Sequence, residues 1–68
     1  MKNFMIQIDC EEEDIPWLES RVMRGLGFWV VDGPNCKQIF VRGSRHDLQK
    51  TIELMGLDGD LEDYLIRE

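Results

Sequence analysis

The sequence predicts one small α+β domain, in which an antiparallel sheet is covered by helices on one face. Residues 3–9 alternate apolar and polar side chains with the period of a strand. Residues 28–41, FWVVDGPNCKQIFV, have the pattern of two apolar strands around a tight turn. Two further segments repeat apolar residues at helical spacing. The chain of 68 residues is expected to form a single domain over 1–68, of a size that buries only about 60% of the surface of its unfolded chain.

The spacing of apolar residues predicts the first strand and the first helix. One side of the strand at 3–9 is wholly apolar and is expected to face the core, namely Phe4, Ile6 and Ile8. A helix is expected over 14–25, with Asp14 as its N-cap and Pro16 near the first turn, where proline is tolerated. The apolar side chains at helical spacing in this region are Ile15, Leu18, Val22 and Leu26.

The hairpin leads into a second helix. Strands are expected at 27–32 and 36–42, joined by a turn that uses Gly33, Pro34 and Asn35. Ser44 is expected to cap the helix, with Asp47 as its partner in a capping box. The helix should end at Gly56, and its core-facing stripe is Leu48, Ile52 and Met55.

The tail at 61–67 has two interpretations. Leu61, Tyr64 and Leu65 fit a short helix capped by Asp60, whereas the alternation of apolar and polar residues also fits an edge strand. The order of elements favours the strand. A final strand after βαββα would complete a two-layer ferredoxin-like βαββα(β) sandwich, an antiparallel sheet with two helices on one face.

This order of elements, taken over the whole chain, resembles that of small ferredoxin-like modules such as the heavy-metal-associated and ACT domains. The resemblance is one of layout. Heavy-metal-associated domains carry a CxxC motif after the first strand, whereas DCEEED at 9–14 has Cys10 followed by three glutamates. Metal transfer is therefore not implied, and we expect no metal and no cofactor.

The charges are divided along the chain. The net charge is −6, with −5 on residues 1–20, +4 on 21–50 and −5 on 51–68. In the ferredoxin-like plan the acidic loops would meet at one end and the basic residues at the other. The expected acidic end comprises Asp9, Glu11, Glu12, Glu13, Asp14, Asp32, Asp58 and Asp60, and the basic end Lys2, Arg21, Arg24, Arg42, Arg45 and Arg67. Net acidity disfavours nucleic acid and anionic membranes and suits a basic protein partner.

The sequence has no membrane-spanning segment, no signal-peptide pattern and no CxxC motif, and these features bear on its location and on its cysteines. No apolar run approaches the roughly 20 residues that span a bilayer, and MKNFMIQIDC lacks the features of a signal peptide. A cytoplasmic protein is expected. Because Cys10 and Cys36 have no CxxC spacing and opposite strand parity, we expect free thiols.

The sequence contains candidate residues for three kinds of small-molecule or catalytic site. The junction VRGSRHD at 41–47 runs from a strand through glycine into a helix N-terminus, which suits a small anion or nucleotide; its candidate ligands are Arg42, Ser44, Arg45 and His46. Four carboxylates could supply oxygens to a hard cation but lack EF-hand spacing, and solvated acidic loops are the expected state of Asp9, Asp14, Asp32 and Asp58. His46 has no nucleophile at a recognisable spacing, so no enzyme is expected.

The functional prediction is based on the apolar side chains at the outer side of the hairpin. If Ile39 and Val41 face the core, Phe40 faces away, and so must either Phe28 with Val30 or Trp29 with Val31. Monomers seldom leave such a patch open. We therefore expect a non-enzymatic protein-interaction module, regulatory or inhibitory, that binds a protein partner or a second copy through Met5, Phe28, Val30 and Phe40. Exposed aromatics can also arise from cross-strand pairing alone, or a helical tail could cover the patch.

Overall fold

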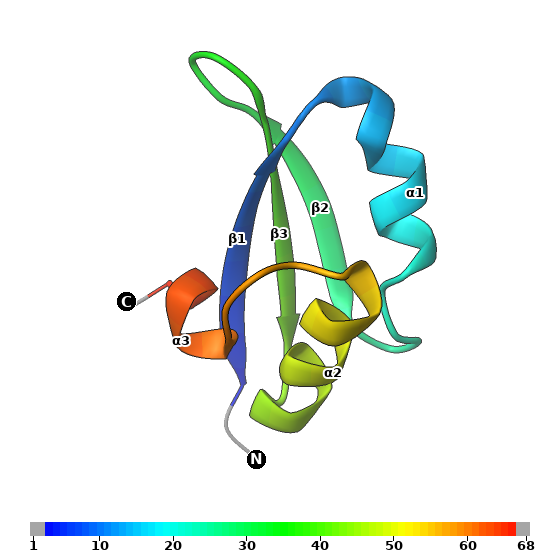
Figure 1. Ribbon diagram of the computed structural model, residues 1–68, viewed down its shortest axis with the longest axis vertical. Helices are drawn as coiled ribbons and strands as arrows, with labels where there is room; N and C mark the ends of the chain where they lie inside the picture. Colours follow the sequence, from blue (N-terminus) through cyan, green and yellow to red (C-terminus); the bar gives the residue numbers. More distant parts are fainter. Residues whose placement is uncertain (1–2, 67–68) are drawn as a thin grey trace.

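The part of the chain that the structure describes contains one sheet of three strands. The structure, a computed structural model, describes residues 3–66. The elements in chain order are β1 (Phe4–Cys10), the 3-10 helix η1 (Glu12–Asp14), α1 (Ile15–Ser20), β2 (Gly27–Asp32), β3 (Lys37–Gly43), α2 (Arg45–Met55) and α3 (Leu61–Tyr64). Strand β3 lies in the middle and is antiparallel to both neighbours, in the order β1-β3-β2 (Figure 1). The prediction of a small α+β fold is confirmed at this level.

The pairing register decides which side chains share the core side of the sheet. Ile8 and Val30 both pair with Ile39, and Ile6 pairs with Val41. Directly opposite residues of antiparallel strands point to the same side, so these positions share one face. The buried apolar residues are Ile6, Ile8, Leu18, Ile39, Val41, Leu48, Ile52, Met55 and Leu61. The expected core sides of the first strand and the second helix are confirmed.

Helix α2 begins and ends as the sequence predicts. The Asp47 backbone N–H donates to the Ser44 side-chain oxygen at 3.2 Å, and Gly56 adopts the left-handed conformation, with φ 69°, that ends the helix. A reciprocal capping box occurs at α3 rather than at α2. There the Asp60 N–H donates to the Asp63 carboxylate at 2.9 Å.

Helix α1 is shorter than expected. The helix predicted over 14–25 is a 3-10 turn followed by the six residues Ile15–Ser20. Ser20 donates its hydroxyl to the Trp17 carbonyl at 2.5 Å, a local bond that competes with helix continuation. The next backbone bonds, including Arg21 N–H to Leu18 C=O at 3.0 Å, have the spacing of a turn rather than of an α-helix. Asp14 occupies the N-cap position without a side-chain cap bond.

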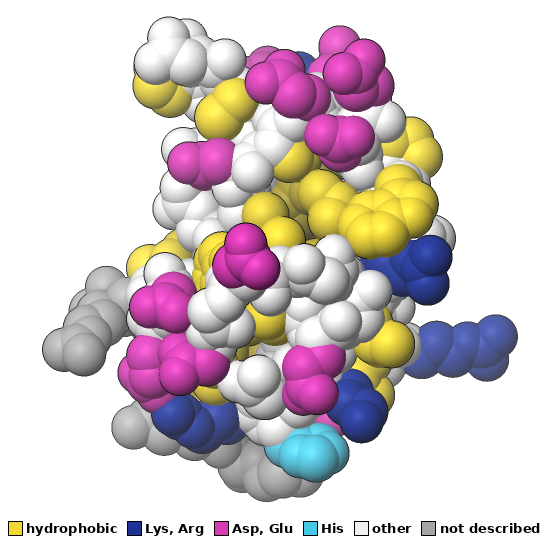
Figure 2. All heavy atoms as spheres, viewed as in Figure 1, with side chains coloured by type: hydrophobic (Ala, Val, Ile, Leu, Met, Phe, Trp, Pro, Cys, Tyr) yellow, Lys and Arg dark blue, Asp and Glu magenta, His cyan; other side chains and the backbone are white. Residues whose placement is uncertain are grey.

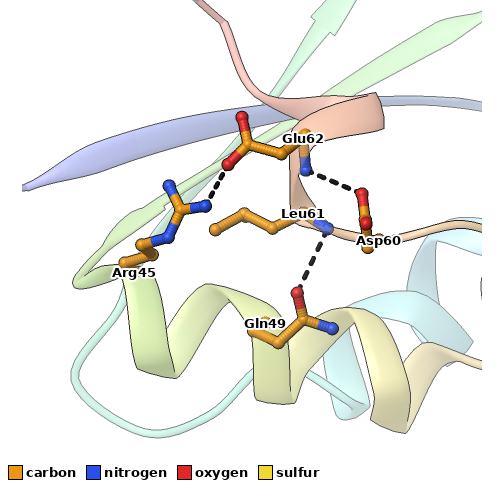
Figure 3. A network of polar contacts seen from close by, with 5 residues as sticks. All are labelled: Arg45, Gln49, Asp60, Leu61 and Glu62. Atoms are coloured by element: carbon orange, nitrogen blue, oxygen red, sulfur yellow. Dashed lines mark hydrogen bonds and ion pairs between the residues drawn. The ribbon is translucent and has the colours of Figure 1, made fainter.

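The tail is a short helix, so the preference for a fourth strand was wrong. Helix α3 docks on α2, and Figure 3 shows the contacts. The Leu61 N–H donates to the Gln49 side-chain oxygen at 3.1 Å, Glu62 pairs with Arg45, and Leu61 is only 2% exposed. The capping box and the burial of Leu61 together stabilise helix over strand, because a strand would leave the Asp60 and Asp63 carboxylates without these backbone donors.

The two edges of the sheet differ. Beyond α3, Leu65 forms an isolated antiparallel bridge with Ile6, and the Ile66 N–H donates to the Met5 carbonyl at 2.9 Å. The edge of β1 is thus partly closed by the chain itself. Strand β2 is the last strand at the opposite side of the sheet among residues 3–66.

The charge separation is only partial. Figure 2 shows acidic side chains grouped at the top of the view and a second acidic group lower down beside basic side chains. Asp60, expected at the acidic end, instead caps α3 beside the Arg45–Glu62 pair (Figure 3). Docking of the tail on α2 brings these carboxylates to the end that was expected to be basic. Lys2 and Arg67 lie outside the described residues.

Candidate functional site

The sheet has an outer face on the side opposite the core. Alternation along the three strands places nine residues there, namely Met5, Gln7, Asp9, Gly27, Trp29, Val31, Gln38, Phe40 and Arg42. None of the nine is buried in the part of the chain that the structure describes. Four of them are large and apolar, and we call these the outer patch: Met5, Trp29, Val31 and Phe40.

An aromatic stack forms the centre of the outer patch. Trp29 pairs directly with Phe40 across β2 and β3, and their rings lie 5.9 Å apart at an interplanar angle of 14°. Gly27 lies under the indole, since a Cβ at this position would lie 3.3 Å from Trp29 Cζ3. The glycine therefore leaves room for the indole to lie along the sheet rather than stand away from it. Trp29 and Val31 still expose 39% and 42% of their surfaces.

Two of the four expected anchors lie on the other side of the sheet. Met5 and Phe40 are on the outer face, as expected. Phe28 pairs with Val41 and packs against the core, and Val30 pairs with buried Ile39. Their places on the outer face are taken by the alternative pair, Trp29 and Val31.

The turn contains the signal that resolves this choice. The Gly33 N–H donates to the Cys36 carbonyl at 2.9 Å, so the connecting loop has two residues between the paired positions. A two-residue loop at Pro34 and Asn35 fixes the register that sets Trp29 opposite Phe40. The turn expected at 33–35 implies a three-residue loop instead, which would set Phe28 opposite Phe40 and so places the wrong pair on the outer face.

The candidate anion-binding residues are divided by the structure. Arg42 and Ser44 line an open depression of about 590 Å³, together with Asp47. Arg45 pairs with Glu62, and His46 is exposed outside this lining. Ser44 already accepts the helix-capping bond from Asp47. The carboxylate of Asp47 at the rim opposes an anion, because like charges repel.

The acidic residues near the hairpin turn pair with a lysine. Lys37 forms an ion pair with Asp32 and lies 4.0 Å from Glu12. The hydrogen bond from Lys37 to Asp32 raises the pKa of the lysine ammonium. Within residues 3–66, no three His, Cys, Asp or Glu side chains converge as a metal site would require.

Both cysteines are free thiols. Cys10 is half-buried at the end of β1, and burial, followed by the negative charge of Asp14, raises the pKa of its thiol. It borders a recess of about 320 Å³ on the helical side of the molecule, beside Trp17 and Met55. Figure 2 shows hydrophobic side chains gathered in a recess at the middle of that side.

A raised pKa predicts slow alkylation of Cys10. The thiolate is the reactive form, and a higher pKa lowers its fraction at neutral pH. In a Cys36→Ser variant, which leaves Cys10 as the only thiol, iodoacetamide should react more slowly with the folded protein than with the same protein in urea. The alkylation rate should begin to increase at a higher pH for the folded protein than for the unfolded protein. Equal rates and equal pH profiles, measured by mass spectrometry, would contradict the shift.

Comparisons with known proteins gave no match for this chain. No family model matches it, and neither the curated proteins nor the solved structures gave a significant match. Among residues 3–66, no helix has the length and apolar character needed to cross a membrane.

Proposed function

We propose that this protein is a non-enzymatic interaction module, regulatory or inhibitory, that binds a protein partner through the outer face of its sheet. The observation that carries the proposal is the outer patch. Trp29, Val31 and Phe40 form a contiguous apolar surface with a stacked aromatic pair at its centre. Aromatic side chains dominate the energetic centres of protein interfaces.

The surroundings of the patch suggest the character of the partner. Asp9 and Arg42 are the charged residues of the outer face, at opposite ends of the strands; Gln38 pairs with Asp9, and Gln7 lies between the two ends. The whole chain carries a net charge of −6. A partner with an apolar contact surface and a basic rim fits both features, because complementary charge accelerates association.

Further parts of the proposal concern fold and location. The strand order β1-β3-β2 and the single core side of the sheet support a two-layer, ferredoxin-like arrangement with two helices on one face. The two free cysteines, Cys10 and Cys36, support a cytoplasmic protein, because disulfides form and persist mainly in oxidising compartments. The acidic surface supports a partner that is neither nucleic acid nor membrane.

Site-specific photo-crosslinking tests the proposal in cells. A photoreactive residue at Gln38, which lies two residues from Phe40 on the outer face, should give one discrete crosslinked species. The matched control carries the same residue at Lys50, which is exposed on α2. The crosslinked product is expected from position 38 alone. Equal products from both positions, or none from position 38, would count against binding at the outer face.

The competing function, sensing of a small anion or nucleotide at Arg42, Ser44, Arg45 and His46, has weaker support. The structure does not gather the four side chains around one depression, and no other observation favours it. Phosphate and nucleotides at millimolar concentration should therefore leave the thermal midpoint of the protein unchanged.

A further inference from the structure

Strand β2 is exposed on its outer face, on its core-side face at Val30, and along its free backbone edge. Its outer side chains, Trp29 and Val31, are 39% and 42% exposed, and Val30 on the core side is also 39% exposed. Val30 stands beside fully buried Ile39, so burial on the core side falls off at Val30, whereas Phe28 on the same side still packs against the core. A partner on the outer face alone would leave Val30 exposed, whereas a strand added beside β2 would cover side chains on both faces.

The backbone of β2 presents free pairing groups to this open edge. Hydrogen-bonded and non-bonded pairs alternate along an antiparallel ladder. Gly33 donates to Cys36, so the register assigns the next bonded pairs to Val31 with Gln38 and Trp29 with Phe40. The N–H and C=O groups of the intervening residues therefore point away from β3. These residues are Phe28, Val30 and Asp32.

The edge also lacks the features that usually block strand addition. Natural edges are protected by charged side chains, proline or bulges. Residues 27–31, GFWVV, contain neither charge nor proline, and the register with β3 is continuous from Gly27 to Asp32. On the other side of the sheet, the bridge from Leu65 to Ile6 occupies the corresponding position.

We propose that β2 pairs antiparallel with β2 of a second copy, joining two molecules into one continuous six-stranded sheet. In the register centred on Val30, the outward backbone groups of Phe28, Val30 and Asp32 all find partners. Val30 then meets Val30 of the other copy on the core side, and Trp29 meets Val31 on the outer side. Each apolar side chain that β2 leaves exposed gains an apolar neighbour.

Local charge on β2 does not oppose a second copy in this register. Asp32 is the only charged residue of β2, and antiparallel pairing sets it opposite Phe28 of the other molecule. The two Asp32 residues are then separated by four positions along the strands, or about 13 Å. This distance exceeds the screening length of about 8 Å at physiological ionic strength. Asp32 is in addition paired with Lys37 of its own chain.

The pairing is distinct from the proposed binding at the outer face, although both involve Trp29 and Val31. It uses the backbone edge of β2, while Phe40 lies on the central strand and would not touch the second copy. Pairing would place two outer patches side by side on one surface. Either proposal can therefore fail without the other.

Proline at position 30 gives the sharpest test. The Val30 N–H is not used in the ladder with β3, so Val30→Pro removes only a donor that points away from the sheet. Strands tolerate proline at such edge positions. The matched control, Val30→Thr, keeps the N–H and the branched shape. Sedimentation across a dilution series should give twice the 8.0 kDa of the chain for the wild type and for Val30→Thr. Val30→Pro should weaken the dimer about 30-fold or more.

Amide hydrogen exchange supplies a second reading. Phe28, Val30 and Asp32 should gain protection as the protein concentration rises, while Trp29 and Val31 should be protected at every concentration. If Val30→Pro fails to fold by circular dichroism, Val30→Lys replaces it as a charged edge residue. A wild type that is monomeric throughout would overturn the pairing. A dimer that survives in a folded Val30→Pro or Val30→Lys variant would also overturn it. The same holds if Phe40→Asp dissociates the dimer while the two Val30 variants do not.

Discussion

Replacing Phe40 by Asp is expected to weaken binding of the crosslinked partner by about 30- to 1,000-fold, the range for loss of an aromatic anchor at the centre of an interface. Phe40 contributes the central ring of the outer patch and stacks on Trp29. The substitution removes this ring and places a carboxylate in an apolar contact, where it would lose water without gaining a partner. Affinity measured by isothermal calorimetry or interferometry gives the result.

The fold should survive this change. Phe40 is half-buried rather than buried, and the stacking with Trp29 contributes about 0.5–1.5 kcal/mol beyond its buried area. Leu54→Asp is the matched control, because Leu54 is 47% exposed on α2 and the same charge is introduced. Val31→Asp is a milder second variant on the outer patch. Similar losses for Leu54→Asp and Phe40→Asp would show that charge, rather than the outer patch, controls affinity.

Replacing Ile39 by Ala is expected to destabilise the fold by about 2–5 kcal/mol. Ile39 is fully buried on the central strand, between Ile8 on β1 and Val30 on β2. A chain of this size has a free energy of unfolding of about 3–10 kcal/mol, so the variant should lose a large fraction of its stability. Urea denaturation followed by circular dichroism measures the loss.

Val30→Ala is the matched control for Ile39→Ala. The two residues are direct cross-strand neighbours on the same side of the sheet, but Val30 is 39% exposed. Its truncation should cost about 1 kcal/mol or less in dilute solution. Equal losses at the two positions would contradict the placement of the core boundary between Ile39 and Val30.

Much of the fold could be predicted because local signals agreed with tertiary packing. The strand at 3–9 alternates cleanly, and Ile6 and Ile8 are buried as its pattern requires. Helix α2 has its cap at Ser44 and its left-handed end at Gly56. At these positions propensity, capping and apolar spacing all favour the same structure.

The errors fall where two structures were locally compatible with the sequence. In α1 the apolar spacing continued to Leu26, but Ser20 and the turn that follows ended the helix early. In the tail, the decisive contacts join Leu61 to Gln49 and Glu62 to Arg45. Contacts between residues so far apart in the chain are not visible in the spacing of the tail itself.

An apolar patch on the outer face was predicted from the sequence, but only two of its four expected residues, Met5 and Phe40, lie there. Four consecutive apolar residues, FWVV at 28–31, fit either face of β2, so alternation could not choose between them. The register set by the turn placed Trp29 and Val31 outward. The exposure of Val30 on the core side depends on how far the helices extend over the sheet, which no local pattern reports.

The fluorescence of Trp29 tests most directly whether a partner covers the outer face. In a Trp17→Phe variant, Trp29 is the only tryptophan of the chain. Adding the crosslinked partner, itself free of tryptophan or with its tryptophans replaced, should shift the Trp29 emission to shorter wavelength and protect it from acrylamide quenching. Binding that leaves both the emission and the quenching of Trp29 unchanged would show that the partner contacts another surface.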